Sequence, residues 1–143
     1  MSQFNPNPQR NAVKNYFPLP NEIYLLGLSS GEIAVYGYLL RCEDRRTFQC
    51  HPSYATIGKA VGLSRNTVRK YVSSLEEKHL ISTERTTVTL RSGEIRNGTL
   101  LYTILPIREA IEFFHQQQME RAETEAERQR MQARLNRAQE EAI

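Results

Sequence analysis

The first regular pattern of hydrophobic positions begins just after Ser29. Between residues 30 and 42 the apolar positions recur every three or four residues, at Ile33, Tyr36, Leu39 and Leu40. This spacing puts them on one face of an α-helix, so the pattern predicts a helix with one side against a core. Ser29 and Glu32 stand three residues apart, as in a capping box, where each side chain bonds the other's backbone N–H. We therefore expect a well-defined helix over residues 30–42.

Two further helices are predicted on either side of Gly62. Ser53 is a suitable first cap, Ile57 and Val61 follow with a spacing of four residues, and Gly62 has the conformational freedom that ends a helix. Ser64 caps the next helix, which covers the sequence SRNTVRKYVSSLEEKHL. The apolar residues of that helix share one buried face: Val68, Val72 and Leu75. The pattern is therefore two short helices joined by a tight turn.

From Ile81 the pattern changes to that of β-strands. The segment STERTTVTL is rich in β-branched residues, and a second such segment, TLLYTIL, follows after RSGEIRNG. The two segments predict a β-hairpin. Asn97 and Gly98 form the expected dipeptide of a tight turn, but Ser92 and Gly93 offer another. The position of the hairpin tip therefore stays open between these two dipeptides.

The C-terminal region predicts one long helix. The 37 residues after Pro106 contain no Gly or Pro and are dense in Glu, Gln, Arg and Ala. Ile107, Ile111 and Phe114 lie in its first turns and can dock on the preceding domain or on a second subunit. Further along, the apolar positions are sparse and recover with coiled-coil spacing only near the end, at Met131, Leu135, Ala138 and Ala142. A solvated helix and a dimer-forming helix both remain open.

These elements divide the chain into three parts. Residues 1–15 are rich in Asn, Pro and Gln and predict a flexible N-terminal arm. Residues 16–106 hold the helices and the hairpin of a folded domain, and residues 107–143 form the long helix, a candidate segment for oligomerisation or partner binding. Residues 1–106 have 13 Lys and Arg against 8 Asp and Glu, a net charge of +5, and the remainder has 6 against 8, a net charge of −2. A basic domain favours a polyanionic partner, although an anionic membrane surface would suit the charge equally.

Composition narrows the classes of function. No stretch approaches the roughly 20 apolar residues of a membrane span, and the N-terminus lacks the apolar centre of a signal peptide. We therefore expect a cytoplasmic protein without a membrane partner, associated with the nucleoid when it is bound to DNA.

The cysteines and histidines do not indicate a metal or catalytic site. Cys42, Cys50 and His51 are too few ligands for a zinc site, so the expected roles are a core residue for Cys42 and a reduced loop thiol for Cys50, within a polar loop EDRRTFQCHP. His79 and His115 lie far from His51 in the expected architecture, and no nucleophile motif or phosphate loop accompanies them. We expect neither an enzyme nor a cofactor, and a structural role for His79.

The third predicted helix starts with polar and basic residues. In the segment from Pro52 to Ile81, the second helix would brace the third, so that the first turns of the third enter the DNA major groove, which is about 12 Å wide. There Arg65 can pair with guanine and Asn66 with adenine, through two hydrogen bonds each. Arg69, one turn further along, would contact a base or a phosphate. Single surface arginines are usually solvated, so it is the arrangement that carries this prediction.

A second set of residues is expected to hold the DNA backbone. Hydroxyl, aromatic and basic side chains at the two helix starts and on the exposed face of the third helix are the candidates: Ser53, Tyr54, Ser64, Thr67, Lys70 and Ser73. In the hairpin, three arginines would bring positive charge to the flanking minor groove or its phosphates: Arg85, Arg91 and Arg96.

The run PS….I….GLSRNTVRKYV..LE…LI resembles the winged helix-turn-helix of GntR-type regulators. It resembles still more the short helix-turn-helix proteins of bacterial plasmids, conjugative elements and phages, over about Leu19 to Leu105. The resemblance implies an α+β, mainly α fold: a winged helix-turn-helix of three helices plus a β-hairpin wing, followed here by the long C-terminal helix. It places DNA-contacting positions at Ser64, Arg65, Thr67 and Arg69. The chain departs from the GntR pattern at Ala55 and Thr56, where that family has an arginine, and it lacks the length for an effector-binding domain.

The expected function is sequence-specific binding of double-stranded DNA, as a transcriptional regulator or an accessory protein of a bacterial mobile element. One alternative is a DNA-binding protein for the replication initiation or partition of a plasmid or phage. Another is a winged-helix protein interaction module that does not touch DNA. The expected partners are double-stranded DNA and, through the C-terminal helix, a second copy of the chain.

Overall fold

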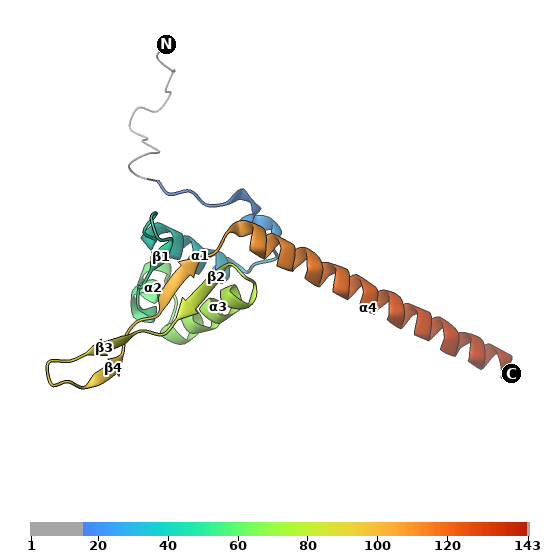
Figure 1. The fold of residues 1–143 in the computed structure, drawn as a ribbon. Coiled ribbons are helices and arrows are strands. Elements are labelled where there is room, and N and C mark those ends of the chain that lie inside the picture. The colour runs from blue at the N-terminus through green and yellow to red at the C-terminus, as the bar shows by residue number, and fades with distance from the viewer. Residues whose placement is uncertain (1–15, 143) are drawn as a thin grey trace, which may run out of the picture.

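A computed structural model describes residues 16–142, so the arm predicted at residues 1–15 lies outside the described residues. The helices are η1 (Asn21–Leu25), α1 (Ser30–Cys42), α2 (Tyr54–Val61), α3 (Arg65–Glu77) and α4 (Ile107–Glu141). The strands are β1 (Gln49–Cys50), β2 (Ile81–Glu84), β3 (Thr87–Thr89), β4 (Ile95–Asn97) and β5 (Leu101–Ile104). Three helices pack beside a small antiparallel sheet, the β3–β4 hairpin projects from one end, and α4 extends away from the body (Figure 1). The fold is a winged helix-turn-helix, which confirms the predicted α+β, mainly α class. None of the described helices is long and apolar enough to cross a membrane.

Helix α1 begins and ends where its pattern predicts. Ser29 Oγ accepts a hydrogen bond from the Glu32 N–H at 3.2 Å, and Glu32 Oε1 accepts one from the Ser29 N–H at 3.1 Å, so the capping box is complete. The residues of α1 that enter the core are Val35, Tyr36, Leu39 and Leu40. Ile33, which the helical spacing placed on the buried face, lies at the edge of the core and is only partly covered.

The turn between α2 and α3 depends on two glycines. Gly62 has φ +73°, a left-handed conformation that residues with a Cβ adopt only at a cost, and it ends α2 as predicted. The Leu63 N–H then donates to the Gly58 carbonyl at 2.9 Å. A Cβ on Gly58 would lie 2.3 Å from the Leu63 carbonyl oxygen, so no larger residue fits there without movement of the backbone. The tight turn fixes the position of α3 against α2.

Helix α3 ends at Glu77, three residues before the end of the predicted segment. His79 has φ +63°, and the N–H groups of His79 and Leu80 donate to the carbonyls of Glu76 and Leu75, the bonding pattern of a Schellman cap. The His79 ring also stacks on Phe113 of α4, with ring centroids 4.3 Å apart. His79 therefore closes α3 and joins it to α4, in line with the structural role expected for it.

The sheet has a strand that the sequence pattern did not predict. Residues Gln49 and Cys50 form β1, which pairs with β5, while β5 pairs with β2 on its other side. The segment predicted as a loop therefore contributes an edge strand. For the same reason the loop position expected for Cys50 is wrong: Cys50 is buried in the core, whereas Cys42 packs against the core at the end of α1 and is partly covered. Burial raises the pKa of the Cys50 thiol to about 12, and the thiol donates to the Leu39 carbonyl at 3.6 Å.

The hairpin tip lies at Ser92–Gly93, the second of the two dipeptides considered. The Gly93 N–H donates to the Leu90 carbonyl at 2.9 Å, the Leu90 N–H donates to the Glu94 carbonyl at 2.8 Å, and Gly93 has φ +84°. These bonds describe a three-residue loop with a glycine in the left-handed position. Gly98 instead lies where the wing joins the sheet. Its N–H donates to the Thr86 carbonyl, and a Cβ there would lie 2.6 Å from Thr86 Oγ1.

Helix α4 is attached to the body only through its first turns. Ala110 is buried, and Ile107, Ile111 and Phe114 pack against the core, which agrees with the docking predicted for those turns. From Gln118 to Ala142 every residue of the helix is exposed. The distal part of α4 therefore makes no packing contact within the described chain and extends outward (Figure 1).

Candidate nucleic-acid interface

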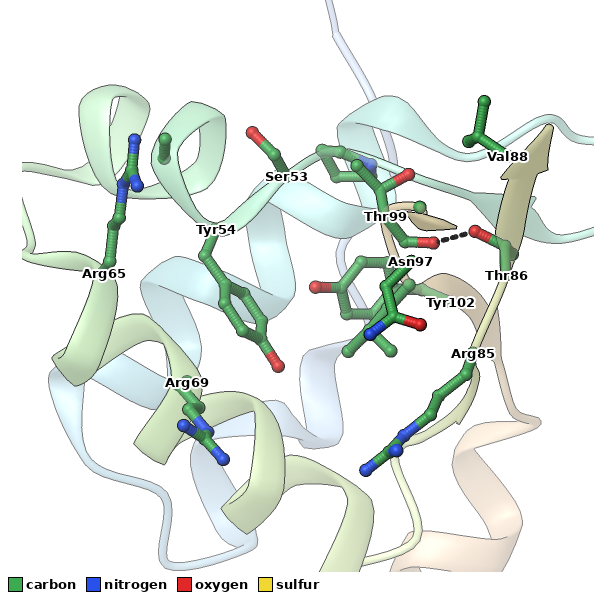
Figure 2. A pocket seen from close by; sticks show the side chains of 14 residues that line it. Ser53, Tyr54, Arg65, Arg69, Arg85, Thr86, Val88, Asn97, Thr99 and Tyr102 are labelled. Carbon is green, nitrogen blue, oxygen red and sulfur yellow. Dashed lines mark hydrogen bonds between the residues drawn. The ribbon is translucent and has the colours of Figure 1, made fainter. Parts of the chain in front are cut away.

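An open cleft of about 830 Å³ lies between the start of α2, the start of α3 and the base of the wing. Figure 2 shows its side chains converging from these three directions. The predicted site residues that line it are Ser53, Tyr54, Arg65, Arg69 and Arg85. Two helices and a strand that are separate in the sequence thus bring five of the twelve predicted residues to one surface.

The cleft carries positive charge without compensating carboxylates. Arg65 and Arg69 reach it from α3, and Arg85 reaches it from the end of β2 (Figure 2). Within residues 16–142, none of these three guanidinium groups forms an ion pair. None of the 14 residues that line the cleft is acidic. Unneutralised arginines on an open concave surface attract an anionic ligand.

The remaining predicted residues of α3 lie outside the cleft. Asn66, Lys70 and Ser73 are exposed and share with Arg65 and Arg69 the face of α3 opposite the buried Val68, Val72 and Leu75. Ser64 Oγ accepts from the Thr67 N–H at 3.2 Å and lies 2.9 Å from Thr67 Oγ1. Ser64 and Thr67 therefore form the cap that holds the start of α3.

The start of α2 has the same construction. Ser53 Oγ accepts from the Thr56 N–H at 3.1 Å and lies 2.9 Å from Thr56 Oγ1. This cap fixes the first turn of α2 at the edge of the cleft. The N-terminus of a helix has a partial positive charge, so α2 adds to the positive charge there. The ring of Tyr54 projects across the cleft toward Arg69 (Figure 2).

The arginines of the wing occupy separate positions. Arg85 lines the cleft, Arg91 lies exposed at the hairpin tip, and Arg96 is exposed in β4 with its guanidinium 3.7 Å from the Glu94 carboxylate. The wing also exposes two large apolar side chains, Val88 and Ile95. The structure therefore places one wing arginine in the cleft and the other two along the projecting hairpin.

Sequence reasoning missed the contribution of the returning strand. Asn97 and Thr99 line the cleft, and the Thr99 carbonyl accepts a hydrogen bond from Thr86 Oγ1 across the base of the wing (Figure 2). Tyr102 of β5 forms part of the floor and is fully buried. Burial first, and then the nearby Tyr54 and Cys50, raise the pKa of the Tyr102 hydroxyl above its usual value. The Asn97–Gly98 dipeptide was visible in the sequence but suggested a turn rather than a site.

A buried carboxylate fixes the far end of α3. Glu32 accepts from Lys78 Nζ at 2.8 Å and from Ser74 Oγ at 2.9 Å, in addition to its capping bond with Ser29. Burial raises the pKa of Glu32, but the bonds from Lys78, Ser29 and Ser74 outweigh it, so the pKa lies below its ordinary value. This network ties α3 to the start of α1, and the orientation of the arginine-bearing face depends on it.

Known proteins are similar to this chain in part. Residues 26–81 match the model of a family described as a helix-turn-helix domain. A solved structure from Methanosarcina mazei Go1, described as a possible transcriptional regulator, is similar at 24% identity with a TM-score of 0.46, over 72% of this chain and 80% of that chain. A comparison with curated protein sequences gave no match. The segment that contains α1, α2 and α3 is therefore similar to a family of helix-turn-helix domains.

Proposed function

We propose that this protein binds double-stranded DNA sequence-specifically, with α3 in the major groove. The observation that carries the proposal is the cleft beside the helix-turn-helix, where, among residues 16–142, three arginines form no ion pair and no carboxylate lines the surface. Helix α3 has 13 residues and is about 20 Å long. An α-helix fits into the DNA major groove, which is about 12 Å wide. Its exposed face is polar and basic along the first two turns, where a recognition helix meets base edges.

The contacts divide into base readout and backbone anchoring. Arg65 and Asn66, at the start of α3, are the proposed readers of guanine and adenine, and Arg69 contacts a base or a phosphate one turn further along. The proposed backbone anchors are the helix-start residues and the outer face of α3: Ser53, Tyr54, Ser64, Thr67, Lys70 and Ser73. The wing brings Arg85, Arg91 and Arg96 to the flanking phosphates or minor groove.

We propose separate roles for the folded domain and for the long C-terminal helix. Residues 16–106 contain the whole DNA-binding surface, and residues 107–143 supply a homodimer contact through α4. Met131 and Leu135 are exposed on this helix. Residues 118–127 have a net charge of −3, with four Glu and one Arg, and residues 128–137 have a net charge of +4, with four Arg and no acidic residue. An antiparallel pair of helices would set each block against its opposite, whereas a parallel pair would oppose like charges.

The proposed cellular role is that of a transcriptional regulator or an accessory DNA-binding protein of a bacterial mobile element. A DNA-binding protein for replication initiation or partition has the same physical requirements. Footprinting on DNA from the organism that encodes the protein separates the two roles. A regulator protects promoter sites, whereas an initiator protects an array of repeats. The proposed location is the cytoplasm. The form bound to DNA would lie at the nucleoid.

Selection of binding sites from random duplex DNA, followed by anisotropy titrations over a salt series, tests the proposal. The affinity should fall steeply as salt rises, because bound arginines and lysines displace counterions from phosphates. Arg65→Ala should weaken binding to the selected site by about 1–3 kcal/mol, roughly ten- to one-hundred-fold, and weaken binding to random DNA much less. Arg41→Ala is the matched control, because Arg41 is an exposed arginine of α1 that does not line the cleft.

Two outcomes would contradict parts of the proposal. Absence of binding at low salt would reject DNA binding and favour a winged-helix protein interaction module. Equal losses on selected and random DNA would reassign Arg65 from base readout to phosphate anchoring.

A further inference from the structure

The hydroxyl of Tyr102 is buried without a hydrogen-bond partner in the described structure. The residue is 0% exposed, and its Oη has neither a donor nor an acceptor within bonding distance. A buried hydroxyl that loses water without gaining a partner destabilises the folded protein. A phenylalanine would fill the same space without this cost. The hydroxyl therefore needs an explanation outside the packing of the free protein.

The position of Tyr102 points to the explanation. Strand β5 lies in the middle of the sheet, between β1 and β2, so the Tyr102 backbone is held on both sides. Its ring forms the floor of the cleft, and the hydroxyl points toward the space between Tyr54 and Asn97 (Figure 2). The N-terminus of α2 and the unpaired Arg69 and Arg85 border the same space. The helix N-terminus and the two guanidinium groups favour a negatively charged oxygen in this space.

We propose that Tyr102 Oη donates a hydrogen bond to one backbone phosphate of the bound DNA, seated between the start of α2 and the base of the wing. This inference rests on the proposed DNA binding and adds a contact from the sheet to those expected from the helices and the hairpin. Tyr54 lies near the hydroxyl, so the phosphate reaches it once the Tyr54 side chain shifts on binding. A neutral donor on a rigid strand fixes where the backbone lies, and this sets the register of α3 in the groove.

The test is Tyr102→Phe, which should weaken DNA binding without lowering the stability of the free protein. The affinity for DNA should fall about five-fold, because one hydrogen bond is lost. The loss should be equal on selected and random duplexes, since both have phosphates, and the salt dependence should not change, since no cation is removed. The melting temperature of the free protein should stay the same or rise, because an unpartnered hydroxyl has been removed.

Tyr36→Phe is the matched control, because Tyr36 is a buried tyrosine of α1, 1% exposed, that does not line the cleft. It should leave the affinity unchanged. Ethylation interference locates the contact. Ethylation of one phosphate in each site should weaken DNA binding by the wild-type protein and should not weaken DNA binding by the Tyr102→Phe variant.

The outcomes separate this inference from the proposed function. If wild-type protein binds DNA and Tyr102→Phe binds equally well, the inference is wrong and DNA binding stands. If Tyr102→Phe melts at a lower temperature, the hydroxyl has a partner inside the fold and the inference is also wrong. If wild-type protein does not bind DNA, both proposals fail.

Discussion

Replacement of Glu32 by Gln should destabilise the fold by about 2 kcal/mol at pH 7. The amide oxygen keeps the bonds from the Ser29 N–H and from Lys78 Nζ at 3.1 Å, but the NH2 group replaces the oxygen that accepts from Lys78 at 2.8 Å and from Ser74. The Ser74 hydroxyl can rotate to accept, whereas the ammonium cannot, so one charge-assisted bond worth about 1.5–3 kcal/mol is lost. Lys78 has a side chain that is 35% exposed, and its return to water keeps the loss below that for a fully buried pair. The melting temperature should drop by roughly 8 °C.

Urea unfolding over a pH series measures this effect and its sign. The pKa of Glu32 is lowered in the folded state, so its contribution is present above the ordinary value of 4.5 and is lost as the pH falls through the lower folded pKa. The gap between wild type and Glu32→Gln should therefore shrink in acid. Glu94→Gln is the control, since Glu94 pairs with Arg96 only on the surface and should change stability by less than about 0.5 kcal/mol. A gap below that size at pH 7, or one that persists unchanged in acid, would refute the reasoning.

Two further predictions follow from the glycines and from α4. In thermal unfolding, Gly58→Ala should destabilise the fold by about 1–3 kcal/mol, because the added Cβ meets the Leu63 carbonyl. Gly37→Ala is the control: its Cβ meets nothing within 4 Å and should stabilise α1 by up to about 1 kcal/mol. Equal effects of the two substitutions would contradict the close approach at the turn. In light scattering at low salt the full chain should form dimers that salt weakens, and a chain ending at Gln118, which keeps every residue that packs on the core, should be monomeric. Identical masses for the two chains would exclude a dimer through the distal helix.

The helices could be predicted because their signals are local. Ser29, Ser53 and Ser64 each cap a helix through a backbone N–H only three residues away, and Gly62 ends α2 through its own φ angle. The short strand β1 has no such signal. Its two residues become a strand only because β5, about fifty residues later, pairs with them. The burial of Cys50 depends on the same distant pairing, and for that reason the loop role expected for Cys50 was wrong.

The hairpin tip shows how a tertiary constraint overrides local preference. Ile81 pairs with Ile104 and Glu84 with Leu101, so the midpoint of the hairpin falls near residue 92. A turn at Asn97–Gly98 would shift this register by ten residues, so that Ile81 would no longer lie opposite Ile104 and β2 would lose its pairing with β5. The same limit applies to the cleft. Arg65 and Arg69 follow from the helix pattern, but Asn97 of β4 and Tyr102 of β5 reach the cleft only because the folded strands bring them there.

The contacts of α3 also limit how α4 can influence DNA binding. The start of α3 is fixed by the turn at Gly58, and its end is joined to α4 through the stacking of His79 on Phe113. Stacked rings contribute about 0.5–1.5 kcal/mol, so a partner that moved α4 through this contact could change DNA affinity by no more than about ten-fold. A second DNA-binding domain held by the same helix raises the effective concentration and can increase affinity by a factor of about 10²–10⁴. Helix α4 should therefore act on DNA binding by joining two DNA-binding domains rather than by reorienting α3.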